Sequence, residues 1–177
     1  MSVELKPEDF DLKNGANLIV VNSSNSILVV REKTRKQMWM LPGGEVERGE
    51  IPSHAAQSET EEETGLITDS VDFRLVAILV QRPKGVVFLY ETHKFRGEVV
   101  VPAHSQEVQE ARFMTLAEMV EEERAERFRT GYLRMVLRYM RCIHGIDPVP
   151  YEGSLRDEVD FPADLDFTAY GKSILSA

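Results

Sequence analysis

GEVERGEIPSHAAQSETEEETGL, at residues 44–66, is the stretch that decides the fold expected for this 177-residue chain. Its second half predicts a helix over residues 52–64. Pro52 suits the first turn of a helix, where its missing N–H is not needed, and Gly65 suits the left-handed position just past a helix C-terminus. Residues 45–51 predict an acidic loop, so we expect this loop to lead directly into the helix.

Three carboxylates of the predicted helix share one face. Glu59, Glu62 and Glu63 are spaced i, i+3 and i+4, so their side chains project from the same side. Like charges at this spacing destabilise a helix by roughly 0.2–0.5 kcal/mol per pair, and no Lys or Arg lies between Pro52 and Leu66. A solvated run of Glu is the alternative interpretation. A divalent cation explains the crowding better, because it turns repulsion into shared attraction, and carboxylate oxygens suit Mg²⁺ or Mn²⁺.

Gly43 and Gly44, just before the acidic loop, let the backbone turn tightly and approach a ligand closely. A backbone carbonyl there could complete the shell of a metal ion. Because Mg²⁺ is usually held by a few carboxylates together with substrate phosphates, the same site favours a diphosphate-containing substrate. A cation in it would neutralise the diphosphate and activate a water molecule.

The pattern formed by these residues resembles the Nudix box, Gly-x5-Glu-x7-Arg-Glu-aliphatic-x-Glu-Glu-x-Gly-aliphatic. Seven of its nine specified positions match, and the residues Trp39-Met-Leu-Pro-Gly-Gly44 resemble the usual segment before the box. The matching positions are Gly44, Glu50, Glu59, Glu62, Glu63, Gly65 and Leu66.

The resemblance implies a Nudix-type α/β/α sandwich, with a mixed sheet between helices, and Mg²⁺-dependent hydrolysis of a diphosphate bond. The substrate would be a nucleotide sugar, ADP-ribose, an oxidised nucleoside triphosphate or a dinucleoside polyphosphate. The implied metal ligands are Glu59, Glu62 and Glu63, with the carbonyl of Gly43 or Gly44. Glu62 and Glu63 are also the expected catalytic residues of the box, and Glu50 would support the site from the loop.

Two positions depart from the family pattern: Ser58 stands in place of Arg, and Thr60 in place of an aliphatic residue. The family Arg holds the glutamates by charge-assisted hydrogen bonds, which Ser cannot supply. A buried threonine hydroxyl needs a hydrogen bond. The departures leave three alternatives: lower activity, another residue that orients the glutamates, or a Nudix-like module that binds a nucleotide or a protein without cleaving it.

Outside the box, the resemblance points to an acidic residue near Glu107 and Glu110 as metal ligand or general base. A solvated loop is an equal alternative. We prefer Glu107 as the base, because Glu110 is expected to be tied to the following strand. Arg31 and Arg82 are candidates for binding substrate phosphates, although surface solubility is the simpler interpretation of each one.

The rest of the chain predicts several strands, followed by a helical region. Asn22 to Ser26 predicts a hairpin turn between the first two strands. Thr115 and Glu118 predict a capping box that opens a helical region running to about Ile143, with a break near Gly131. The expected strands are 16–21, 27–30, 73–81, 86–95, 98–101 and 112–114.

We therefore divide the chain into a polar lead-in at 1–15, a Nudix domain at 16–145 and an acidic tail at 146–177 that contains Pro and Gly. The formal net charge of −9 disfavours nucleic acid and anionic membranes as partners. One cysteine, Cys142, allows no disulfide within the chain. No secretory signal or membrane-length apolar run occurs, so a cytoplasmic protein is expected. The resemblance also leaves a homodimer open.

Overall fold

The structure is a computed structural model that describes residues 13–33, 37–81, 85–103 and 105–144. This part of the chain contains seven strands and three α-helices, with a short 3₁₀ helix, η2, after α1. The strands are β1 (Gly15–Val20), β2 (Ile27–Glu32), β3 (Trp39–Met40), β4 (Gly43–Glu45), β5 (Arg74–Gln81), β6 (Gly85–Thr92) and β7 (Val108–Met114). The helices are α1 (Pro52–Thr64), η2 (Ser70–Asp72), α2 (Leu116–Arg124) and α3 (Thr130–His144).

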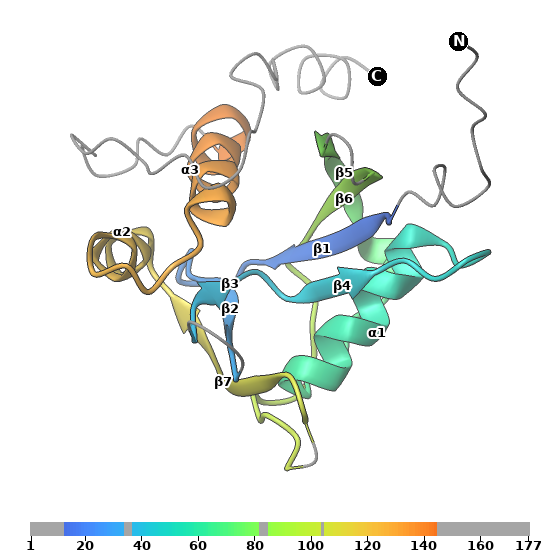
Figure 1. The fold of residues 1–177 in the computed structure, drawn as a ribbon, viewed down its shortest axis with the longest axis horizontal. Coiled ribbons are helices and arrows are strands. Elements are labelled where there is room, and N and C mark those ends of the chain that lie inside the picture. The colour runs from blue at the N-terminus through green and yellow to red at the C-terminus, as the bar shows by residue number, and fades with distance from the viewer. Residues whose placement is uncertain (1–12, 34–36, 82–84, 104, 145–177) are drawn as a thin grey trace, which may run out of the picture.

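The strands form two sheets. A four-stranded mixed sheet has the order β4-β1-β6-β5, with β1 parallel to β6 and antiparallel to β4. A three-stranded antiparallel sheet has the order β3-β2-β7. Figure 1 shows α1 on one side of the sheets and α2 and α3 on the other. The expected α/β fold, with a mixed sheet and helices on both sides, is confirmed.

The predicted hairpin is correct only at its tip. Asn22 accepts hydrogen bonds from the amides of Ser24 and Ser26, which forms the turn, and one bridge joins Val21 to Ile27. Beyond it β1 and β2 separate into different sheets. Both edges of β1 are already taken by β4 and β6, so β2 pairs with β3 and β7 instead.

The helix boundaries agree with the sequence signals. Helix α1 begins at Pro52 and ends before Gly65, whose φ of 70° is left-handed. At α2 the Thr115 side chain accepts from the Glu118 amide, and the Glu118 carboxylate accepts from the Thr115 amide, which completes the capping box. The helical region breaks between Arg124 and Thr130, slightly before the predicted position, since Gly131 lies in the first turn of α3.

Two strand predictions needed correction. Residues 98–101 form no strand, because the Val100 amide donates to the Thr64 carbonyl at the end of α1 (2.8 Å) and the segment packs on that helix end. The expected strand at 112–114 is longer, since β7 pairs with β2 along most of its length.

Two apolar clusters hold the layers together. One lies between the sheets and α2 and α3, and includes Ile19, Trp39, Leu133 and Tyr139. The other lies under α1 and includes Leu18, Ala56 and Leu66. Within the residues described, no helix is both long and apolar enough to cross a membrane.

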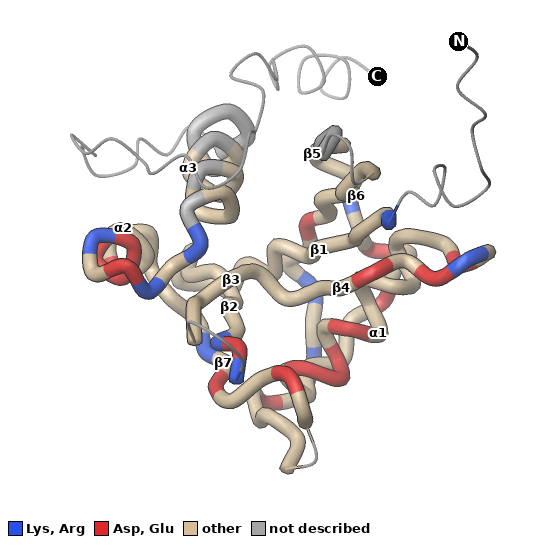
Figure 2. The backbone as a smooth tube through the Cα atoms, in the orientation of Figure 1, with Lys and Arg blue, Asp and Glu red and all other residues tan. Residues whose placement is uncertain are grey.

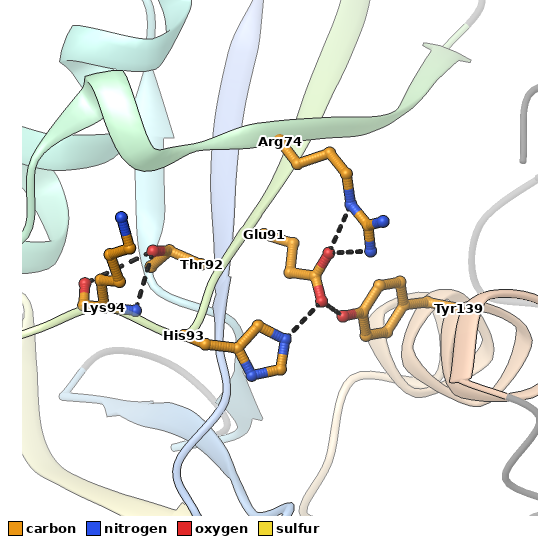
Figure 3. Close-up of polar contacts among 6 residues, drawn as sticks. All are labelled: Arg74, Glu91, Thr92, His93, Lys94 and Tyr139. Atoms are coloured by element: carbon orange, nitrogen blue, oxygen red, sulfur yellow. Dashed lines mark hydrogen bonds and ion pairs between the residues drawn. The ribbon is translucent and has the colours of Figure 1, made fainter. Parts of the chain in front are cut away.

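A buried carboxylate fastens α3 to the mixed sheet. Glu91, on β6, is only 3% exposed and accepts hydrogen bonds from Arg74 of β5 and from the hydroxyl of Tyr139 on α3. His93 contacts the same carboxylate at 2.8 Å. Figure 3 shows these three side chains converging on Glu91 from separate elements. Because a buried charge is tolerated only when it is paired, this cluster fixes where α3 lies on the sheet.

Candidate active site

The Gly43–Gly44 strand lies against the carboxylates of α1. The Gly43 amide donates a 3.0 Å hydrogen bond to Oε2 of Glu63, a side chain that is 5% exposed. A Cβ on Gly44 would lie 2.3 Å from Oε1 of Glu59, so a larger residue at this position would displace that carboxylate. Gly43 has a φ of 136° and no space for a side chain. The two glycines therefore lie beside Glu59 and Glu63 at the start of β4.

Three further carboxylates that the sequence predicts for the site act on Glu59 or on Glu63. The charges of Glu62, on the helix, and of Glu107, in the loop before β7, act on both Glu59 and Glu63. Glu50 acts on Glu59 as well, and its carboxylate also accepts from the Glu47 amide (2.9 Å). Figure 2 shows the acidic residues along α1 and at the start of β7.

Burial and like charge together perturb this cluster. Desolvation and, to a smaller extent, the charges of Glu59, Glu107 and Glu62 together raise the pKa of Glu63 to about 8, against the lowering effect of the Gly43 hydrogen bond. Desolvation and then the charge of Glu62 raise the pKa of Glu59. Without a counter-charge, the buried carboxyl of Glu63 therefore holds a proton near neutral pH.

The structure distinguishes the two loop glutamates. Glu107 lies just before β7, where its carbonyl accepts from the Lys33 amide (2.6 Å), and its charge reaches Glu59 and Glu63. Glu110 lies within β7, opposite Arg31 of β2, and its carboxylate is 3.6 Å from that guanidinium. Glu110 is tied to its strand as expected, and the choice of Glu107 as the base stays a prediction.

Of the two candidate phosphate-binding arginines, the structure describes only Arg31. Arg31 donates to the Gln37 carbonyl (3.0 Å), and its guanidinium lies 5.8 Å from the Trp39 ring centre. Its charge acts on Glu122 of α2, so it lies on the α2 side of the small sheet and not among the α1 carboxylates. Arg82 lies outside the residues that the structure describes.

The two departures from the family pattern have different consequences. Ser58 is exposed, so no group at this position holds the glutamates from within the protein. Thr60 is fully buried, and its hydroxyl donates to the Ala56 carbonyl of the same helix (2.7 Å), which satisfies it. The substitution at Thr60 is therefore accommodated, whereas the substitution at Ser58 leaves the orientation of the glutamates to other residues.

Sequence reasoning missed two residues beside the site. Asn17 is a buried amide on β1 that donates to the Pro42 carbonyl (3.2 Å), and it acts on the side chain of Tyr132 on α3, whose pKa burial raises and Asn17 lowers. The charge of Glu63 reaches the Tyr132 hydroxyl. A single amide within the apolar run 16–21 was the signal that could have drawn attention to Asn17.

The donor chemistry fits a hard divalent cation, which prefers carboxylate and carbonyl oxygens. The charged groups that raise the pKa of Glu59 and Glu63 are all carboxylates, which a cation would stabilise in their charged form. Among the described side chains, no three acidic, His or Cys groups are gathered closely enough to hold an ion by themselves. Backbone carbonyls, water and substrate phosphates would therefore have to complete the shell.

Comparisons with known proteins agree with this architecture. A model of the NUDIX domain matches residues 11–136. A protein of Bacillus subtilis (strain 168), provisionally named an 8-oxo-dGTP diphosphatase, is 40% identical over 85 residues, which are 48% of this chain and 52% of that protein. The RNA pyrophosphohydrolase of Pelagibacter ubique (strain HTCC1062) is 29% identical over 89 residues, 49% of this chain and 56% of that protein.

Among solved structures, the crystal structure of a MutT NUDIX hydrolase from Burkholderia pseudomallei superimposes with a TM-score of 0.50 and 26% identity. The match covers 59% of this chain and 84% of that one. The chain spans about half the length of the two sequence relatives it matches, at 52% and 56%.

Proposed function

Because this chain belongs to the NUDIX domain family, whose model matches residues 11–136, we propose that it is a hydrolase that cleaves a diphosphate bond with the help of Mg²⁺ or Mn²⁺. The observation that carries the proposal is the placement of Glu63 and Glu59 against Gly43 and Gly44 of β4, with the charges of Glu62 and Glu107 acting on both carboxylates. Neighbouring carboxylates raise one another's pKa unless a positive charge is present. A divalent cation supplies that charge and can bind the diphosphate of a substrate at the same time.

In the proposed mechanism, Glu59, Glu62 and Glu63 would hold the cation, with a carbonyl of Gly43 or Gly44. When bound, the cation supplies neutralisation of phosphate charge and acidification of water. Glu107, whose charge reaches the cluster from the loop, accepts the proton of the attacking water. A new P–O bond forms at one phosphorus, and the bond from that phosphorus to the bridging oxygen breaks. The second phosphate leaves with that oxygen.

For the substrate, we propose a nucleoside compound that contains a diphosphate. The names of the two sequence relatives, an 8-oxo-dGTP diphosphatase and an RNA pyrophosphohydrolase, support this class. A nucleotide sugar, ADP-ribose and a dinucleoside polyphosphate belong to it as well. The second relative acts on RNA, so the expectation that nucleic acid is excluded stays a prediction. The homodimer and the cytoplasmic location also stay predictions.

A substrate panel tests the proposal. The full-length chain is incubated with Mg²⁺ or Mn²⁺ and with 8-oxo-dGTP, 5′-triphosphorylated RNA, ADP-ribose, a nucleotide sugar and a dinucleoside polyphosphate, and the phosphate-containing products are separated. We expect metal-dependent cleavage of at least one compound and its loss in Glu63→Gln. Glu61→Gln is the matched control, because Glu61 is exposed on the same helix. Full turnover in Glu63→Gln contradicts the proposal.

The exposed Ser58 favours one second candidate, a catalytically weak module that binds a nucleotide or a protein. The variant Ser58→Arg separates the two candidates. An enzyme whose glutamates are already held by other residues gains little from the arginine. A module that has lost activity with its arginine regains cleavage of some compound in the panel, and this result would favour the second candidate.

A further inference from the structure

The absence of the family arginine raises the question of what holds Glu63. The described contact is a backbone one, the 3.0 Å hydrogen bond from the Gly43 amide to Oε2 of Glu63. Its geometry depends on the Pro42–Gly43 peptide, since that peptide carries the donating N–H. Whatever fixes this peptide therefore fixes the carboxylate.

Asn17 fixes that peptide from the neighbouring strand. Its side-chain amide donates to the Pro42 carbonyl at 3.2 Å, and the Leu18 backbone amide donates to the same oxygen at 3.1 Å. Gly43 packs directly on Asn17, because a Cβ on Gly43 would lie 2.6 Å from Nδ2 of the asparagine. Asn17 is 4% exposed, so its amide lies among protein atoms, where a hydrogen bond is costly to lose.

Tyr132 extends this arrangement to α3. Its side chain lies within reach of the Asn17 amide and of the charge of Glu63. An asparagine amide carries two N–H groups, so Asn17 can hold Pro42 and Tyr132 together. The contacts form a continuous series of neighbours from α3 to the carboxylate: Tyr132, Asn17, Pro42, Gly43 and Glu63.

From this geometry we propose that Asn17 and Tyr132 are positioning residues, which orient Glu63 through the Pro42–Gly43 peptide and replace the missing arginine at Ser58. Neither residue takes part in the chemical step. Their effect is to hold one oxygen of Glu63 on the Gly43 amide and so direct the other oxygen of the carboxylate. The proposal rests on the proposed hydrolase function, because it assigns Glu63 to the site of that reaction.

Hydrogen exchange tests the proposal without any activity measurement. In the full-length protein, we expect the Gly43 amide to exchange roughly three- to tenfold faster in Tyr132→Phe and in Asn17→Ala, as one hydrogen bond of this series is lost. The Gly65 amide, which donates to the Glu61 carbonyl at 2.8 Å, is the internal control and should not change. Unchanged exchange at Gly43 in Tyr132→Phe overturns the proposal, even if Asn17→Ala does not fold.

Kinetics and Mg²⁺ titration then separate positioning from other roles, with Tyr139→Phe as the matched control. Tyr139 is on the same helix, but its hydroxyl donates to Glu91 beneath α3. For Tyr132→Phe we expect a roughly three- to tenfold lower kcat, a KM within about twofold of wild type and a higher Mg²⁺ concentration at half-saturation. For Tyr139→Phe we expect a lower melting temperature with an unchanged kcat.

Two results would overturn the positioning role. A higher KM for Tyr132→Phe with unchanged Mg²⁺ half-saturation would make Tyr132 a substrate contact. A lower melting temperature with unchanged kcat and Gly43 exchange would make it a structural residue only. Failure of the proposed function is recognised separately, since a wild-type chain that cleaves nothing still allows exchange at Gly43 and Mg²⁺ binding to be measured.

Discussion

The pKa of Glu63 predicts how the stability of the metal-free protein depends on pH. Burial and neighbouring carboxylates raise this pKa from 4.5 to about 8 in the folded state, whereas an unfolded chain has the ordinary value. Between these two values the folded state binds more protons than the unfolded state. The free energy of unfolding therefore falls as the pH rises from about 4.5 to about 8.

The size of the effect follows from the same shift. One pH unit corresponds to about 1.36 kcal/mol, so a single site with this change in pKa contributes at most on the order of 5 kcal/mol. The carboxyl is 5% exposed, so solvent screens it little. The pKa of the neighbouring Glu59 is raised as well. The two carboxyls therefore titrate together, and part of the change in stability with pH comes from Glu59. We expect a loss of a few kcal/mol between pH 5.5 and pH 9.

Urea denaturation of the EDTA-treated protein at several pH values measures this slope. Glu63→Gln is neutral at every pH, so its stability relative to wild type should increase by a few kcal/mol between pH 5.5 and pH 9. Glu61→Gln, exposed on the same helix, should keep a constant difference from wild type. Parallel pH curves for wild type and Glu63→Gln would refute the assignment of a buried, proton-binding carboxyl to Glu63.

Three further substitutions test local parts of the account. Gly44→Ala puts a Cβ 2.3 Å from the Glu59 carboxylate, so Mg²⁺ binding measured by calorimetry should weaken at least about tenfold. The control is Gly15→Ala on β1, where a Cβ has contacts of 3.4 Å, and it should leave Mg²⁺ binding unchanged. Thr115→Ala removes the capping box of α2 and should lower the free energy of unfolding by about 1 kcal/mol in urea; no loss would show that the cap is not important. Thr60→Val removes a hydroxyl that bonds only within its own helix, so stability should change by less than about 1 kcal/mol; a larger loss would give the hydroxyl another role.

The features that the sequence predicted are those determined by neighbouring residues. The start of α1 at Pro52 and its end at Gly65 depend on the φ angles that each residue favours. The capping box at Thr115 depends on a spacing of three residues. The carboxylate face of α1 follows from helical periodicity alone. In each case the deciding interaction lies within a few positions along the chain.

What the sequence could not predict depends on contacts between distant segments. The division of β1 and β2 into two sheets follows from which strands occupy the edges of β1, and those strands come from residues far along the chain. The interaction of Asn17 with Tyr132 links β1 to α3, which lie far apart in the chain. Residues 98–101 have a strand-like composition, but the Val100 amide of this segment donates its hydrogen bond to the Thr64 carbonyl at the end of α1.

The most direct test of the central claim is anomalous diffraction from crystals soaked in Mn²⁺, which takes the same oxygen ligands as Mg²⁺. We expect a manganese peak bonded to carboxylate oxygens of Glu59 and Glu63, beside the Gly43–Gly44 turn. Well-diffracting crystals with saturating Mn²⁺ and no peak at these carboxylates would contradict the account.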